Sequence, residues 1–181
     1  NGIPLSESMN IGPVMMEVQF YRQLKQIVPE VVDFTLLSNW GGVTVVSIDK
    51  KAKKKVPGLA KKVAFAVKTL KASPFVKNVV VVDDDIDVHD PHQVLWCLST
   101  RFQGAKDINV IPGAAGSFLD PSEPWLNWSG DGYGYTSYTI FDCTEKLPPY
   151  DIGYRRGLAQ PAADVWKRID KEWDSGGFLK G

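Results

Sequence analysis

The chain has 181 residues, 44% of them hydrophobic, and its 21 Lys and Arg balance its 21 Asp and Glu. This length allows one ordinary domain with its own core, and the balanced charge argues against a nucleic-acid-binding or membrane-surface protein. The two cysteines, Cys97 and Cys143, lie too far apart for a CxxC motif, and no apolar run reaches membrane-spanning length. We therefore expect a cytoplasmic protein. Because the chain begins with Asn1, we interpret it as processed or as a piece of a longer protein.

The first elements predicted along the chain are a helix and two strands. Gly12 and Pro13 mark a helix start, and apolar residues then recur at helical spacing until Pro29. Residues 31–37 are rich in β-branched and aromatic side chains, which predicts a strand. Residues 43–48 predict a second strand, antiparallel to the first.

A lysine-rich segment and a second helix follow. Residues 50–62 contain seven lysines, which could form an anion-binding patch or a solvated loop that leads into a helix. We favour the solvated loop because the chain as a whole carries balanced charge. A helix is predicted over residues 57–70, and the apolar run 79–82 is typical of a buried parallel strand.

The last third of the chain combines a short strand, a long loop region and a helix. Residues 109–111 predict a short final strand, and residues 112–150 are rich in Gly, Pro, Ser and aromatics without regular periodicity. Pro161 opens a last helix with Trp166 and Trp173 on one apolar stripe, which suits a subunit interface. The sequence therefore predicts an α/β fold: a mixed, mostly parallel sheet flanked by helices, with an extended C-terminal loop region and a terminal helix.

Five aspartates follow the buried strand: Asp83, Asp84, Asp85, Asp87 and Asp90. Ligands of open α/β sheets bind beyond the carboxyl ends of the strands, and clustered carboxylates there could hold Mg²⁺. Alternatively, the aspartates cap the next helix and accept backbone hydrogen bonds in a tight turn. Asp90 is the expected N-cap, because Pro and Gln follow it at the first and third helical positions. Spacing alone leaves both hypotheses open.

Other motifs are weaker. His89 and His92 lie three residues apart across a helix start and do not make a convincing metal pair, and no GxSxG marks a nucleophile. Gly130–Gly134 has a glycine-rich pattern but follows no predicted strand, so we do not interpret it as a dinucleotide fingerprint.

Several motifs, in their order along the chain, resemble the UbiD-type decarboxylase family. Residues 79–90 (VVVVDDDIDVHD) and 94–102 (VLWCLSTRF) are similar to the strand-turn and the following helix that mark this family. The similarity extends to the segments 2–13, 27–33, 60–64 and 141–146. It covers nearly the whole chain and points to the family's smaller C-terminal domain.

The resemblance implies a carboxy-lyase that acts, in some members reversibly, on an aromatic or α,β-unsaturated acid. The implied cofactors are prenylated FMN with a divalent metal (Mn or Mg) and potassium. In the family the catalytic residues and metal ligands lie in an upstream flavin-binding domain, so we expect this chain to carry none of them and to bind no cofactor alone. We expect residues 1–28 to be a linker helix from that domain, 29–150 the C-terminal α/β domain, and 151–181 a tail and helix.

The resemblance also implies two substrate-contacting loops and a set of partners. The expected contacts are Pro74 and Phe75 before the acidic strand, and Ser117, Phe118 and Leu119 after the final strand. The expected partners are the flavin-binding domain or its subunit, an acid substrate and further copies of the chain, but no nucleic acid or membrane. The alternative is a free-standing metal- or nucleotide-binding module centred on residues 83–87, and a third possibility is an accessory subunit that completes its site with another chain.

Overall fold

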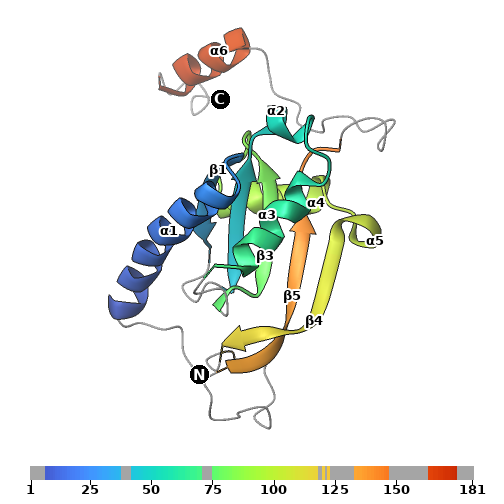
Figure 1. Cartoon of the computed structure of the whole chain (residues 1–181). Helices are drawn as coiled ribbons and strands as arrows, with labels where there is room; N and C mark the ends of the chain where they lie inside the picture. Colours follow the sequence, from blue (N-terminus) through green and yellow to red (C-terminus); the bar gives the residue numbers. More distant parts are fainter. Residues whose placement is uncertain are drawn as a thin grey trace.

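A five-stranded mixed sheet with the order β1-β2-β3-β5-β4 forms the centre of the computed structural model (Figure 1). The structure describes residues 7–37, 42–70, 75–117, 120, 122, 133–146 and 163–174. The strands are β1 (Val31–Leu36), β2 (Val43–Ile48), β3 (Asn78–Asp83), β4 (Ile108–Ser117) and β5 (Tyr133–Asp142). The helices are α1 (Glu7–Ile27), α2 (Lys50–Lys53), α3 (Leu59–Lys68), α4 (Pro91–Thr100), α5 (Gly104–Asp107) and α6 (Ala163–Asp174).

Strand directions confirm the predicted α/β fold. β2 pairs in parallel with β3, and β3 in parallel with β5, so three strands run the same way. The two edge strands run oppositely, since β1 is antiparallel to β2 and β4 is antiparallel to β5. The expected antiparallel pair at residues 31–48 and the buried parallel strand at residues 79–82 are therefore both present.

One prediction was wrong: the segment 112–150 is not all irregular. β4 continues to Ser117, well past the expected end at residue 111, and β5 is a ten-residue strand. The pairing of β4 with β5 shifts between Ile111 and Ala114, where Gly113 has a φ of 68°. Glycine adopts this left-handed backbone without strain, so the strand passes through the irregularity and continues.

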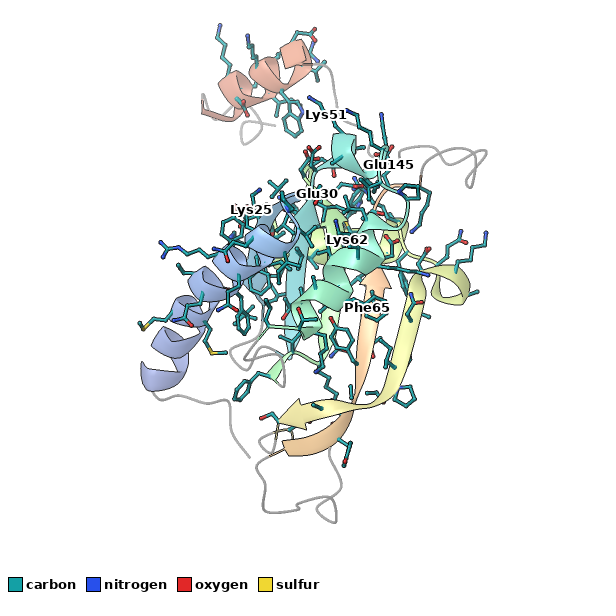
Figure 2. The ribbon with its side chains drawn as sticks, viewed as in Figure 1. Lys25, Glu30, Lys51, Lys62, Phe65 and Glu145 are labelled. Atoms are coloured by element: carbon teal, nitrogen blue, oxygen red, sulfur yellow. The ribbon has the colours of Figure 1, made fainter. Side chains whose placement is uncertain are left out.

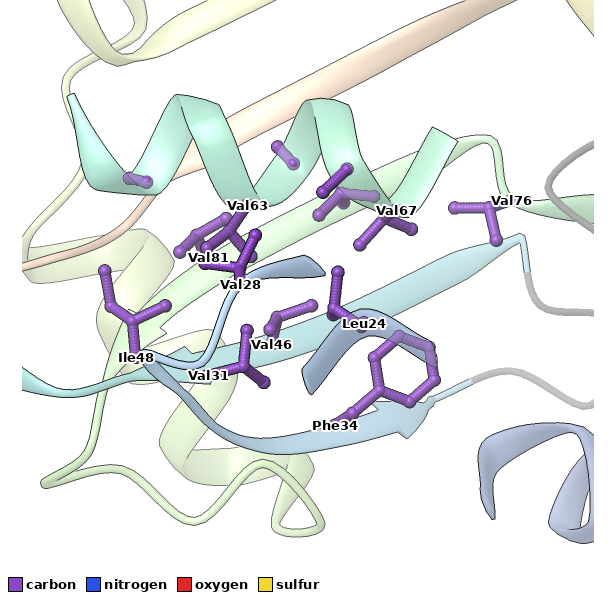
Figure 3. Packing of buried hydrophobic residues seen from close by; sticks show 14 of the residues in the cluster. Leu24, Val28, Val31, Phe34, Val46, Ile48, Val63, Val67, Val76 and Val81 are labelled. Carbon is purple, nitrogen blue, oxygen red and sulfur yellow. The ribbon is translucent and has the colours of Figure 1, made fainter. Parts of the chain in front are cut away.

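Helices cover the first face of the sheet and form the larger core. Apolar residues at helical spacing, Leu24 and Val28 near the end of α1 and Val63 and Val67 on α3, are fully buried against the sheet (Figure 3). Successive strand residues point to opposite faces, so β3 contributes Val79 and Val81 to this core. The strands add the further members Val31, Phe34, Val46, Ile48, Tyr138 and Ile140.

The second face of the sheet carries a smaller core beneath α4. Its strand members include Val80 and Val82, the alternate residues of β3, and α4 supplies Val94 and Cys97. β3 is thus buried on both faces, which explains its unbroken run of valines.

The terminal helix α6 lies apart from the sheet in Figure 1. Trp166, on its predicted apolar stripe, is 49% exposed. None of the helices in the described part of the chain is long and apolar enough to span a bilayer.

Candidate functional site

Two of the aspartates at the carboxyl end of β3, Asp83 and Asp85, pair with basic side chains. Asp83 is fully buried, and its Oδ1 lies 2.6 Å from Lys53 Nζ. Its Oδ2 accepts a hydrogen bond from the backbone N–H of Glu145 and lies 3.5 Å from Arg101 Nη1. Both carboxylate oxygens therefore already have partners within the chain.

Asp85 has a bidentate partner. The two terminal nitrogens of Arg101 donate to its two oxygens at 2.9 Å each, and Lys50 Nζ lies 3.9 Å away. Arg101 also stacks over the ring of Trp96, at 5.1 Å from the ring centroid. Burial alone would lower the pKa of the Arg101 guanidinium, but its hydrogen bonds and attraction to Asp85 outweigh burial and raise that pKa.

Burial also shifts the Asp83–Lys53 pair. Loss of water raises the pKa of Asp83 and lowers the pKa of Lys53, and the attraction between the two groups opposes both shifts. Each group is the largest single stabiliser of the other's charge, so removing one would take the strongest compensation from a buried charge.

The lysine-rich segment is divided between this network and solvent. Lys50 and Lys53 turn toward the acidic residues, and Lys50 also pairs with Glu145, which lies at the end of the sheet near α2 (Figure 2). Lys51 and Lys54, by contrast, are exposed. The solvated-loop interpretation is therefore wrong for Lys50 and Lys53, because α2 holds them against the aspartates.

Asp87 and Asp90 organise the start of α4, as the turn hypothesis predicts. Asp90 Oδ1 accepts from the backbone N–H of His92 at 2.9 Å, which confirms it as the N-cap. This hydrogen bond lowers the pKa of Asp90. The Gln93 side chain donates to the Asp90 carboxylate and accepts from the backbone N–H of Asp87 at 3.1 Å. In a standard capping box this side chain would instead accept from the N–H of the N-cap residue itself.

The metal-binding hypothesis gains no support from this geometry. Within the described residues no group of three His, Cys, Asp or Glu side chains could hold a metal ion. His89 Nε2 lies 3.4 Å from Oδ2 of Asp33, a residue of the edge strand β1. The arrangement favours a structural role for Asp83, Asp85, Asp87 and Asp90, while Asp84 is exposed.

The two cysteines are buried thiols rather than nucleophiles. Burial raises the pKa of Cys97 to about 11, and it raises the pKa of Cys143 further. At neutral pH both remain protonated, whereas nucleophilic chemistry requires the thiolate.

The opposite end of the sheet brings together two loops that were predicted to contact substrate. Phe75 lies just before β3, and Ser117 ends β4. Lys68 Nζ donates to the carbonyl of Val76 at 3.2 Å and to that of Ala115 at 2.8 Å, which ties the two segments together. Pro74, Phe118 and Leu119 lie outside the described residues.

A second lysine joins the same two segments. Lys77 Nζ lies 2.8 Å from Asp120 Oδ2. The sequence did not point to Lys68, Lys77 or Asp120, because the Ala115 carbonyl lies 47 positions from Lys68 and Asp120 lies 43 positions from Lys77. No local motif marks such residues.

Comparison with known proteins places these features in a family. The profile of the 3-octaprenyl-4-hydroxybenzoate carboxy-lyase C-terminal domain matches residues 9–143, more than half of the chain. The phenolic acid decarboxylase of Sedimentibacter hydroxybenzoicus is 34% identical over 174 residues, which cover 94% of this chain and 34% of that protein. The anhydromevalonate phosphate decarboxylase of Aeropyrum pernix is 35% identical over 153 residues, covering 83% of this chain and 32% of that protein.

Solved structures agree with the sequence comparison. The UbiD-class enzyme HmfF from Pelotomaculum thermopropionicum, in complex with FMN, has a TM-score of 0.68 at 32% identity and covers 91% of this chain and 34% of its own. The chain thus spans about a third of the length of these relatives. The chain belongs to the UbiD family of carboxy-lyases, in which it corresponds to the C-terminal domain.

Proposed function

We propose that this chain closes the substrate pocket and helps to assemble the subunits of a UbiD-family decarboxylase, while another domain supplies the flavin and the catalytic groups. The match to the family's C-terminal domain, within relatives three times as long, is the observation that carries this proposal. The ion pairs of Asp83 and Asp85 support this proposal. Carboxylates held in ion pairs within the chain are poorly suited to act as catalytic groups.

The proposed cofactors are prenylated FMN, a divalent metal (Mn or Mg) and potassium. Bound flavin would act as the electron sink for loss of the carboxylate, and the protein would supply placement. The described part of the chain has no cluster of ligands that fits a metal ion. On the family resemblance, we assign the cofactor site to the flavin-binding domain.

The proposed role of this chain is to present apolar contacts to the substrate. Phe75 and Ser117, with Pro74, Phe118 and Leu119 beside them in sequence, would line one side of the pocket. The lysine bridges between their segments support this role, since they hold together two loops that are distant in sequence. Contacts of this kind orient an acid and exclude water, but they transfer no proton.

The proposed substrate is an aromatic or α,β-unsaturated carboxylic acid, decarboxylated in a reaction that is reversible in some members of the family. One relative is a phenolic acid decarboxylase and another an anhydromevalonate phosphate decarboxylase. The two names indicate different substrates. An unsaturated acid without an aromatic ring is therefore the second candidate substrate. The free-standing metal- or nucleotide-binding module is disfavoured by the ion pairs of Asp83 and Asp85.

The complete enzyme, this chain with its flavin-binding domain, would form a homo-oligomer in the cytoplasm. The test is release of CO₂ by that enzyme, loaded with prenylated FMN, from a panel of hydroxybenzoic, cinnamic, heteroaromatic and anhydromevalonate phosphate substrates. We expect turnover of at least one acid and none of its saturated analogue. Turnover of none of the panel would contradict the proposal.

A further inference from the structure

The two edge strands of the sheet, β1 and β4, differ in how they are protected. Figure 1 shows α1 beside β1 and β4 on the opposite side of the sheet. Side chains of α1 bond to the backbone of β1: the Glu17 carboxylate accepts from the N–H of Leu36 at 2.6 Å, and the Tyr21 hydroxyl donates to the carbonyl of Val32 at 3.1 Å. These bonds occupy groups that an incoming strand would use, so α1 protects this edge.

β4 has no such cover in the described part of the chain. It ends the strand order, and none of its ten residues, Ile108–Ser117, carries a charge. Lys68 donates to the carbonyl of Ala115, so the half of the strand that follows Gly113 is partly occupied. Residues 108–111 form the more open half. A long uncharged edge strand is a template for pairing with another chain.

Exposed apolar side chains lie on the same half of β4. Ile108 and Val110 point to one face, because successive strand residues alternate between the two faces. Phe141, opposite Ile108 on β5, packs against the smaller core beneath α4. Ile108 and Val110 therefore lie beside that core, and they are 38% and 56% exposed. The open backbone edge and an exposed apolar surface thus coincide on one short segment.

We propose that β4 pairs antiparallel with β4 of a second copy of this chain, across a two-fold axis near Val110. Antiparallel pairing of a strand with its own copy satisfies two-fold symmetry, because each chain presents the same groups to the other. Since α1 blocks the β1 edge, sheets joined through β4 stop at two copies instead of growing into a fibre. The inference rests on the assembly role proposed above and names the surface that performs it.

The strand pairing is one part of a larger contact. A stable interface needs about 800 Å² from each partner, and a single strand edge supplies only a fraction of that area. Ile108 and Val110 of the two copies would adjoin across the axis, and α6 would add a further contribution through Trp166. Loss of one of these elements should therefore weaken the dimer without abolishing it.

The first test compares Val110→Lys with Leu95→Lys in the full chain, by analytical ultracentrifugation. Val110 and Leu95 are 56% and 58% exposed, but Leu95 lies on α4, so its variant is the matched control. Lysine on β4 would bring like charges together across the axis and remove apolar contact. We expect Val110→Lys to weaken the dimer at least about tenfold and Leu95→Lys to leave it unchanged. Equal melting temperatures would show that both variants remain folded.

The second test needs no substitution and uses hydrogen exchange of the unmodified chain. Amides of residues 108–111 should exchange more slowly at concentrations where the dimer forms than at concentrations where it dissociates. Residues 31–36 of β1 are the internal control, because α1 already covers that edge. Exchange of 108–111 that does not depend on concentration would overturn the proposal, and so would equal weakening by the two lysine variants.

The same measurement separates this interface from other occupants and from the decarboxylase activity. If residues 108–111 become protected only when the flavin-binding domain is added, that domain occupies the edge and the proposal is overturned. If the complete enzyme releases CO₂ while β4 stays unpaired, the interface fails and the proposed activity stands. If β4 pairs in the dimer but the enzyme turns over no acid, the interface stands and the proposed activity fails.

Discussion

The guanidinium of Arg101 donates two parallel hydrogen bonds to the carboxylate of Asp85, from Nη1 to Oδ1 and from Nη2 to Oδ2, each 2.9 Å long. The Arg101 side chain is 1% exposed, and its Nη1 also lies 3.5 Å from the fully buried Asp83. This fork-like geometry fixes the acidic turn to the end of α4. The aspartate-rich turn resembles a metal site, but its carboxylates Asp83 and Asp85 find their charge partners within the chain itself.

Replacing Arg101 should destabilise the chain strongly. Arg101→Met leaves Asp83 and Asp85 without their shared partner, and breaking a buried pair costs about 3–5 kcal/mol. Arg101→Lys retains the charge but not the bidentate geometry, so its loss should be smaller. Urea unfolding gives the free energies, and exposed Lys106→Met is the control, with an expected change within about 0.5 kcal/mol.

Two results would contradict this account of the acidic turn. The first is an Arg101→Met variant as stable as the unmodified chain. The second is micromolar Mg²⁺ or Mn²⁺ binding in calorimetry that Asp84→Ala or Asp85→Ala abolishes, which would revive the metal-site hypothesis.

Acid should remove the stabilising contribution of Asp90. Its pKa is lowered in the folded chain by the hydrogen bond from the N–H of His92, so the folded state binds the proton less readily than the unfolded state. The stabilisation is therefore present above the unfolded pKa, about 3.9, and is lost as the pH falls through the lower folded value.

The measurement is unfolding free energy between pH 7 and pH 2 for the unmodified chain, Asp90→Ala and Asp90→Asn. Asp90→Ala should be less stable at pH 7, and its deficit should shrink as the pH falls below about 4. Asn is an equally good N-cap that does not titrate, so Asp90→Asn should differ little from the unmodified chain at pH 7. A deficit of Asp90→Ala that is constant across this range would show that the carboxylate charge contributes nothing.

The elements that could be predicted from the sequence are those marked by a local pattern of residue types. The valine run of β3 and the paired strands β1 and β2 were predictable, because β-branched residues dominate them and β3 is buried on both faces. The expected end of β4 was too early because Pro112 and Gly113 are loop signals that here accompany a strand irregularity, and Gly116 is a further loop signal that pairs regularly in the sheet. β5 contains Gly134 and follows a long loop-like segment, so its alternation was overlooked.

The site was predicted only in part. The family motifs led to Phe75 and Ser117, and the structure brings their segments to one end of the sheet. The lysines that hold the segments together could not be inferred, since Lys68 reaches a carbonyl 47 positions away. Such contacts depend on the order of the strands in the sheet, which no local motif encodes.

The C-terminal tail should contribute to self-association. α6 combines apolar residues such as Val165, Trp166 and Ile169 with charged ones, and Trp166 is half-exposed. Aromatic residues are enriched in interface cores. Light scattering should find the full chain self-associated and a version truncated after Pro149 monomeric, or much weaker in association. If the full chain stays monomeric at high micromolar concentration, or the truncated chain associates equally well, the tail is not the assembly element.

The division of labour between this chain and a flavin-binding domain is tested most directly by measuring CO₂ release. The isolated 181-residue chain, supplied with prenylated FMN and Mn²⁺, should release no CO₂ from cinnamic, hydroxybenzoic or heteroaromatic acids. The same chain joined to its flavin-binding domain should turn over at least one acid of the wider panel. Turnover by the isolated chain would contradict the account, because it would require catalytic groups in the chain that the account assigns to another domain.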